Sequence, residues 1–224
     1  MRLRTRLSLA AAVWFVARSA FGATAEAWPA VDDADWKPFG ESDGVAVFTR
    51  PFAGSAFPEV RASGTVCATL PELVAFVEDV ARFDGWIPDT EEARLLARPS
   101  PREQFYYIRT SMPWPVKHRD MIYRLSQSLS GPSADDVSVA IEGVPDYLPP
   151  YPNVVRMTRV TDRWTFREDA GRTHLKLDMH IEPGGSIPTM LANRRIVGTP
   201  TKMLVNLRQQ FASSCHGEPG AAEK

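Results

Sequence analysis

Apolar and polar residues alternate most regularly along residues 173–182. Successive side chains of a β-strand point to opposite faces of the sheet. The segment therefore predicts a strand with one buried face and one face in water. The apolar positions on the buried face are Leu175, Leu177, Met179 and Ile181.

The same two-residue period, bounded by turn residues, predicts further strands on either side of one helical segment. These strands cover residues 45–50, 59–67, 93–98, 103–112, 119–129, 137–143 and 155–167. Short turns such as 169–171 join most of them, so neighbouring strands are expected to pair antiparallel. The sequence thus predicts a long antiparallel sheet.

Two longer segments have helical spacing, and a short helix is expected at 32–36. The first runs from Leu70 to about Phe83, where Thr69 and Glu72 form a capping-box pattern at its start. The second covers 188–211. Its apolar residues recur every three to four positions, and Gly198 and Pro200 are expected to kink or weaken it.

This order of elements predicts an α+β fold, because a long amphipathic helix after a sheet must cover an apolar surface. A sheet of this length tends to curl. A curled sheet gripped by a helix either packs solidly or encloses a cavity, and the pattern alone leaves both open.

The N-terminus has the order of a secretory signal: basic residues, the apolar run Leu7–Ala17, then small residues up to Ala25. The apolar run is shorter than the roughly 20 residues that cross a bilayer. We expect a signal peptide at 1–25 and a periplasmic or secreted protein, with one domain at 26–213 and a disordered tail at 214–224.

The charge and the cysteine and histidine content bear on which kinds of molecule the chain could bind. After residue 25 the chain is mildly acidic and has no Lys/Arg cluster, which argues against nucleic-acid binding. Cys67 and Cys215 could pair in an oxidising compartment, but sequence cannot supply the geometry that a disulfide needs. Neither their spacing nor that of the histidines indicates a metal site.

Three segments resemble conserved signatures of START (StAR-related lipid-transfer) domains. The segment 112–123 reads MPWPVKHRDMIY, 83–88 reads FDGWIP, and 182–188 reads EPGGSIP ahead of the last helix. The resemblance implies a helix-grip fold around an interior cavity that binds a lipid or sterol-like ligand. Arg119 and Asp120 are expected to be structural, through a local ion pair or backbone hydrogen bonds.

One feature of sterol-binding START domains is absent. Where such members carry a buried arginine and acid, this sequence has Leu125 and either Tyr106 or Tyr107. The resemblance therefore leaves the ligand open. Tyr107 and Arg109 share a face of their strand, which suggests a different polar contact.

On this basis we predict the residues that line a ligand cavity. They are Tyr107, Arg109, Met121, Tyr123, Leu125, Leu175, Leu177, Met179, Val197, Met203, Leu204 and Leu207. The proline-rich loop 144–153 is predicted to be a lid that touches membranes through Tyr147, Leu148 and Tyr151, because tyrosines suit a polar–apolar boundary.

We find no sequence motif of a hydrolase, nucleotide-binding or zinc enzyme, so a non-enzymatic, cofactor-free monomer is expected. Arg194 and Arg195 are expected to be solvated. Two rival functions stay open. A cyclase or aromatase predicts that Tyr107, Arg109 and Tyr123 converge in the cavity, and a ligand-free structural protein predicts a filled interior.

Overall fold

A computed structural model describes residues 35–128 and 136–216. The predicted signal peptide at 1–25 lies outside these residues, as do 32–34 of the expected short helix and 217–224 of the expected tail. Among the described residues, no helix has the length and apolarity needed to cross a membrane.

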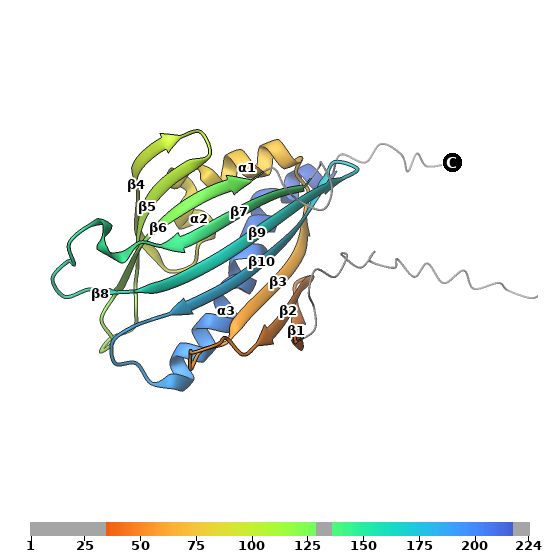
Figure 1. Cartoon of the computed structure of the whole chain (residues 1–224). Helices are drawn as coiled ribbons and strands as arrows, with labels where there is room; N and C mark the ends of the chain where they lie inside the picture. The colour runs from red at the N-terminus through yellow and green to blue at the C-terminus, as the bar shows by residue number, and fades with distance from the viewer. Residues whose placement is uncertain (1–34, 129–135, 217–224) are drawn as a thin grey trace, which may run out of the picture. The chain divides into compact units, whose positions relative to one another are not determined.

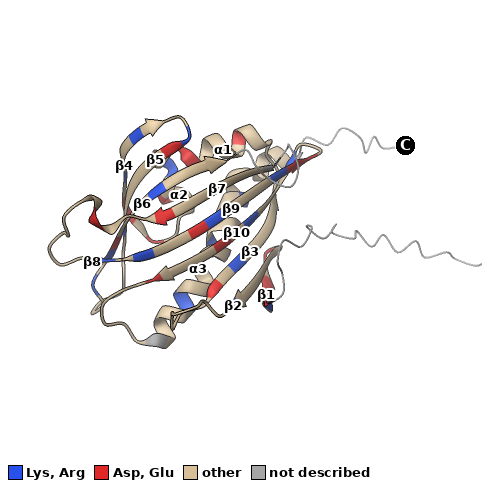
Figure 2. Cartoon of the chain, in the orientation of Figure 1, with Lys and Arg blue, Asp and Glu red and all other residues tan. Residues whose placement is uncertain are grey.

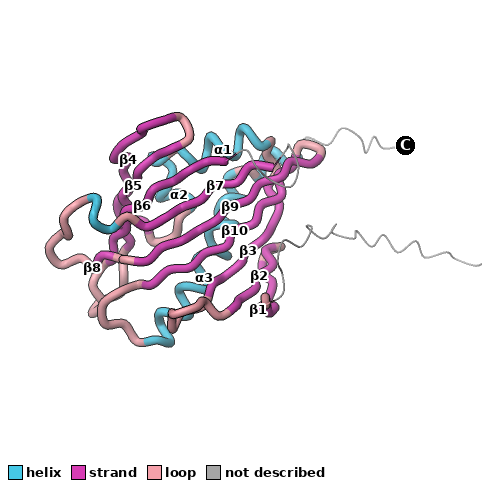
Figure 3. The backbone as a smooth tube through the Cα atoms, in the orientation of Figure 1, coloured by secondary structure: helices cyan, strands magenta, loops and turns pink. Residues whose placement is uncertain are grey.

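The α+β helix-grip fold is confirmed. A curved sheet is gripped by a long C-terminal helix, α3 (Thr189–Gln210). The short helix α2 (Phe83–Trp86) packs against α3, and α1 (Leu70–Glu78) packs against β9 and β10 (Figure 1). Figure 3 shows that the strands dominate the described chain.

The sheet has ten strands in the order β1-β2-β3-β10-β9-β7-β6-β5-β4, and β8 pairs with β6. All pairings are antiparallel except that of β8 with β6. The strands are β1 Lys37–Ser42, β2 Val45–Arg50, β3 Glu59–Val66, β4 Thr90–Ser100, β5 Glu103–Thr110, β6 Arg119–Ser128, β7 Asp136–Gly143, β8 Val155–Arg156, β9 Arg159–Asp169 and β10 Arg172–Glu182.

Several elements differ from the sequence prediction. Asp35 lies in a turn and Trp36 is not helical, and both precede a strand, β1, that was not predicted. β1 and β2 form a hairpin across Asp43-Gly44, whose φ angles are both positive, as a tight hairpin turn requires. The strand predicted at 155–167 is split into β8 and β9.

The helix predicted from Leu70 to Phe83 breaks after Glu78. Its start agrees with the prediction, since the Glu72 carboxylate accepts hydrogen bonds from the Thr69 backbone N–H and hydroxyl. Asp79 then leaves the helical conformation and accepts from the Ala81 N–H. It thereby caps a new turn, the 3-10 helix η1 (Val80–Arg82), which leads into α2.

The C-terminal helix is continuous through Gly198 and Pro200. Proline has no N–H to donate to the carbonyl four residues earlier. At the next residue, the Thr201 hydroxyl donates a hydrogen bond to the Val197 carbonyl at 3.5 Å. That bond does not replace the one missing at the Ile196 carbonyl, and the helix nevertheless continues to Gln210.

A disulfide joins the segment after β3 to the C-terminal turn. Cys67 follows β3 and is bonded to Cys215 in the 3-10 helix η3 (Ala212–His216). Residues 214–216, which were expected in the disordered tail, therefore form the end of an ordered turn. The disulfide fixes that turn beside the end of β3.

Charged residues of both signs lie along the strands (Figure 2). On β10 they are confined to the face opposite Leu175, Leu177 and Met179. Asp178, for example, pairs with Arg61 of β3 at 2.6 Å. One face of the sheet is thus left apolar for the helices to cover.

Candidate ligand-binding cavity

A cavity of about 140 Å³ lies between the inner face of the sheet and the three α-helices. Its walls come from strands β5, β6, β7, β9 and β10 and from α1, α2 and α3. Most of the residues that line it are apolar, and several are aromatic: Phe83, Trp86, Tyr123, Trp164 and Phe166.

Five of the predicted lining residues face this cavity: Met121, Tyr123, Leu125, Met179 and Met203. Register explains the first three, which alternate along β6. Tyr123 stands opposite Tyr106 and Met121 opposite Ile108 on β5, and Leu125 stands opposite the cavity-lining Ile141 on β7.

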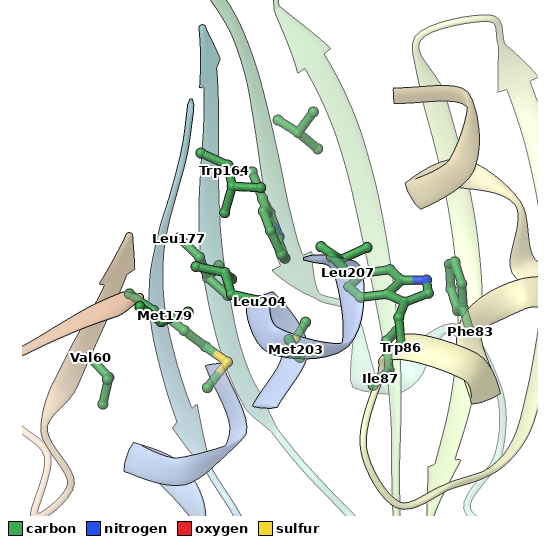
Figure 4. Close-up of a cluster of buried hydrophobic side chains, with 14 of the residues drawn as sticks. Val60, Phe83, Trp86, Ile87, Trp164, Leu177, Met179, Met203, Leu204 and Leu207 are labelled. Carbon is green, nitrogen blue, oxygen red and sulfur yellow. The ribbon is translucent and has the colours of Figure 1, made fainter. Parts of the chain in front are cut away.

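Five others lie on the correct side of the sheet but do not border the cavity. Leu175, Leu177, Leu204 and Leu207 are buried in the hydrophobic core cluster, and Val197 packs against it. Figure 4 shows part of this cluster, in which Leu177, Leu204 and Leu207 lie near cavity-lining residues such as Trp86, Trp164 and Met203. α3 thus lines the cavity through Ala192, Ile196, Thr199 and Met203, whereas Leu204 and Leu207 near its C-terminal end pack in the core beside the cavity.

Tyr107 and Arg109 do not line the cavity, and their prediction is corrected. Both lie on the outer face of β5, because the inward positions of that strand are Tyr106 and Ile108. The Tyr107 ring contacts that of Tyr151 with centroids 5.4 Å apart. Arg109 pairs with Glu91 and Glu92 at 3.2 and 3.1 Å.

The lid prediction for loop 144–153 is also corrected. Tyr147 stacks on Phe105, with ring centroids 4.8 Å apart, on the outer face of β5. Tyr151 lies on the same outer face, and the Leu148 carbonyl accepts a hydrogen bond from Arg156 at 3.0 Å. Prolines and aromatic residues attach this loop to the back of the sheet, so it does not cover the cavity.

Arg119 and Asp120 are structural, but they do not pair with each other. Arg119 donates to the Pro183 and Gly184 carbonyls at 3.3 and 3.2 Å, and so fixes the turn before α3. Asp120, which is buried, accepts two hydrogen bonds from Arg156 at 2.8 and 3.0 Å. Burial lowers the pKa of Arg119.

One part of the cavity lining carries polar and charged groups beside a methionine: Asp89, Thr110, Met112, Arg119 and Arg195. Arg195 was expected to be solvated, and that expectation is corrected. Its guanidinium pairs with Asp89 at 3.1 Å and donates to the Ser111 carbonyl at 3.3 Å. α3 is therefore fastened to the turn after α2 and to the end of β5.

Two acidic residues in the cavity were missed by sequence reasoning. Asp162 projects from the inner face of β9, on the same side as Trp164 and Phe166. Burial raises the pKa of its carboxyl to about 8. An acid in the apolar register of a predicted strand was the available signal.

Glu78, at the end of α1, is the second. Its Oε2 accepts a hydrogen bond from the Gln104 amide at 3.3 Å, while Oε1 is buried without a partner among the described residues. Burial raises the pKa of Glu78. The Tyr106 hydroxyl donates to the Glu78 backbone carbonyl at 2.8 Å, and burial raises the Tyr106 pKa to about 12.

The histidines lie away from the cavity. His174 hydrogen-bonds to Thr65 at 2.9 Å, and His180 is stacked on Phe52 with ring centroids 3.7 Å apart. Across the described ranges, no group of three or more His, Cys, Asp or Glu side chains is placed to hold a metal ion.

The sequence model of the START domain matches residues 26–217, and the chain belongs to the START domain family. An uncharacterised protein of Pseudomonas aeruginosa is 30% identical over 202 residues, which cover 89% of this chain and 93% of the relative.

Solved structures agree with this membership. A STAR-related lipid transfer protein from Xanthomonas axonopodis superposes with a TM-score of 0.73 at 35% identity, covering 80% of this chain and 99% of that one. Human StAR-related lipid transfer protein 5 superposes with a TM-score of 0.71 at 20% identity, covering 82% and 89%. The second likeness concerns the fold alone.

Proposed function

We propose that this chain is an exported carrier that sequesters or transfers a lipid or another hydrophobic molecule, and that it is not an enzyme. The observation that carries the proposal is the apolar cavity between the sheet and the helices. A purely structural protein was expected to have a filled interior, so the cavity supports a carrier over that rival.

The driving force is the transfer of apolar ligand surface out of water, at about 25 cal/mol per Å². An apolar cavity of roughly 150 Å³ is large enough to admit benzene. The cavity here, about 140 Å³, therefore fits a small apolar group as it stands. A whole lipid requires its walls to move apart.

The arrangement of polar residues favours a carrier over a cyclase. A cyclase was predicted to bring Tyr107, Arg109 and Tyr123 together in the cavity. Tyr123 lines the cavity, whereas Tyr107 and Arg109 lie on the opposite face of the sheet. The Xanthomonas relative, whose name describes lipid transfer, supports the same choice.

We further propose that the ligand enters beside Arg195, where α3 meets Met112 and Asp89. The Arg195 guanidinium contacts the Met112 sulfur at 2.9 Å, so separating these elements opens the cavity. This route replaces the one through loop 144–153.

Membrane contact is proposed at the same end of the molecule. Trp114 is 93% exposed and Met190 is 83% exposed, although such residues are normally buried. Trp114 follows Met112 closely, and Met190 precedes Arg195 on α3. Anionic vesicles should shift Trp114 fluorescence in the wild type, and the shift should disappear in Trp114→Ser.

Export to the periplasm or the cell exterior, and function as a monomer, are also proposed. The START match begins at residue 26, directly after the predicted signal peptide. The Cys67–Cys215 disulfide is of a kind that persists in oxidising compartments.

The experiment is extraction of lipid from the purified protein, followed by mass spectrometry. The proposal expects one class of hydrophobic molecule at about one per chain, as a single cavity implies. Repeated extracts without such a molecule, together with no uptake of added lipid, would overturn it.

A further inference from the structure

The Met112 sulfur lies 2.9 Å from the Arg195 guanidinium, which donates a hydrogen bond to it. The same guanidinium nitrogen donates to the Ser111 carbonyl at 3.3 Å, and the other terminal nitrogen pairs with Asp89 at 3.1 Å. Met112 and Arg195 both line the cavity. A thioether sulfur is a weak acceptor, so a strong cationic donor is joined here to a poor partner.

Methionines carry the oxidisable sulfur of this chain. Both cysteines of the sequence are joined in the Cys67–Cys215 disulfide, so no free thiol competes for an oxidant. Met112 is only partly buried, and among the described methionines it is the one whose sulfur has a cationic donor beside it. Three other methionines are almost fully buried: Met157, Met179 and Met203.

Oxidation would change the weak acceptor of Met112 into a strong one. The thioether sulfur attacks one oxygen of hydrogen peroxide, the O–O bond breaks, and the proton of the transferred oxygen passes to the departing hydroxide. The peroxide is thereby reduced to water, and the sulfur is oxidised by two electrons to a sulfoxide. The sulfoxide oxygen carries partial negative charge, and hydrogen bonds that involve an ionised donor are stronger than neutral ones.

We infer that Met112 is an oxidation site, and that the Arg195 guanidinium binds the resulting sulfoxide oxygen and so holds α3 more tightly against residues 111–112. The oxidant is a hydroperoxide, and reduction of the sulfoxide restores the starting state. The site itself is independent of the proposed carrier function. Its effect on ligand exchange rests on that function and on the proposed route beside Arg195.

The test treats the protein with hydrogen peroxide at a level that oxidises the exposed Met190 completely. Peptide mass spectrometry locates each added oxygen atom. Hydrogen–deuterium exchange of residues 190–197 then measures how firmly the N-terminal part of α3 is held. The proteins are the wild type, Met112→Leu, Arg195→Leu and Met190→Leu. Met190→Leu is the matched control, because Met190 does not line the cavity.

The inference expects one added oxygen on Met112 in the wild type, and backbone exchange across 190–197 slowed by about 3- to 10-fold, the value of one hydrogen bond. Met190→Leu should show the same slowing. Met112→Leu should show none, because leucine has a similar volume but no sulfur. Arg195→Leu should take up oxygen at Met112 without slowing, since it has no donor for the sulfoxide.

Three results would overturn the inference: no oxygen on Met112 when Met190 is fully oxidised, unchanged backbone exchange in the oxidised wild type, or equal slowing in Met112→Leu. Circular dichroism of each variant confirms that it is folded.

Release of an apolar dye, N-phenyl-1-naphthylamine, is measured by stopped-flow fluorescence on the same samples and should slow by a similar factor after oxidation. A wild type that binds no dye contradicts the carrier function, while oxygen uptake and backbone exchange still decide the inference. Unchanged dye release together with slowed backbone exchange contradicts the proposed route beside Arg195 and leaves the oxidation site supported.

Discussion

Arg195 of α3 and Asp89 of the turn after α2 both line the cavity, and they form a 3.1 Å ion pair. Both side chains are partly exposed, so the pair contributes little to overall stability, about 0.2–1 kcal/mol. Its position matters more than its strength, because it joins the two elements whose separation is the proposed route of the ligand.

Removal of this pair should speed exchange of the ligand. Arg195→Gln or Asp89→Asn is expected to raise the entry and exit rates of a bound apolar dye, N-phenyl-1-naphthylamine. The expected increase is about two- to fivefold, which corresponds to the free energy of an exposed ion pair. Stopped-flow fluorescence measures both rates. Arg82→Gln breaks the more exposed Arg82–Asp79 pair, neither residue of which lines the cavity, and is the control. Equal acceleration in the control would contradict this role.

The buried pair of Asp120 and Arg156 should behave differently. Asp120→Asn leaves the Arg156 guanidinium without its carboxylate, and loss of one partner of a buried pair costs about 3–5 kcal/mol. Urea unfolding followed by fluorescence gives the free energy of unfolding. Glu142→Gln removes an exposed partner of Arg124 and should cost less than about 1 kcal/mol. Similar losses in the two variants would refute the distinction.

The Cys67–Cys215 disulfide closes a sequence separation of 148 residues. Reduction with dithiothreitol should lower the free energy of unfolding by about 2–5 kcal/mol, because the unfolded chain regains conformational freedom. The double variant Cys67→Ser/Cys215→Ser should show the same lower stability and no response to dithiothreitol. Two free thiols in the native, unreduced protein would disprove the bond.

Asp162 should leave a signature in the pH dependence of stability. Its pKa rises from an ordinary value of 3.8 to about 8 in the folded protein. Below pH 3.8 both states hold the proton. Between these values only the folded state holds it, so the Asp162 contribution to stability falls as pH rises, by at most about 1.4 kcal/mol per pH unit.

Asp162→Asn should remove this slope between pH 4 and 8, so the variant gains stability over the wild type as pH rises. Glu78, Asp89, Arg119 and Arg195 also face the cavity but are unchanged in the variant. The free energy of unfolding of each protein is measured by urea titration at several pH values. The difference between wild type and variant, plotted against pH, therefore isolates the contribution of Asp162. Parallel curves would show that this carboxyl is ionised in the folded protein.

Much of the fold could be predicted from the sequence, because an element buried on one face repeats apolar residues at a regular spacing. Leu175, Leu177 and Met179 fixed the inner face of β10 in this way. β1 was missed because its residues are exposed throughout and leave no such period. The helix break at Asp79 was missed because the apolar spacing continues across it.

The site was less predictable, since period alone does not say which face of an isolated strand is inward. Tyr107 and Arg109 were grouped correctly with each other but assigned to the wrong face, and the register with β6 resolves it. Met203, Leu204 and Leu207 are all buried apolar residues of α3, but only Met203 borders the cavity. Whether an inward residue meets another side chain or a void depends on the tertiary packing.

The most direct test of the carrier account is native mass spectrometry of the protein with a cavity-filling variant beside it. Ala192 is buried on the cavity side of α3, and Lys202 is exposed on the same helix. The account predicts a bound hydrophobic molecule in the wild type and in Lys202→Trp, and none in Ala192→Trp. A ligand that persists in folded Ala192→Trp, or a wild type that never carries one, would contradict it.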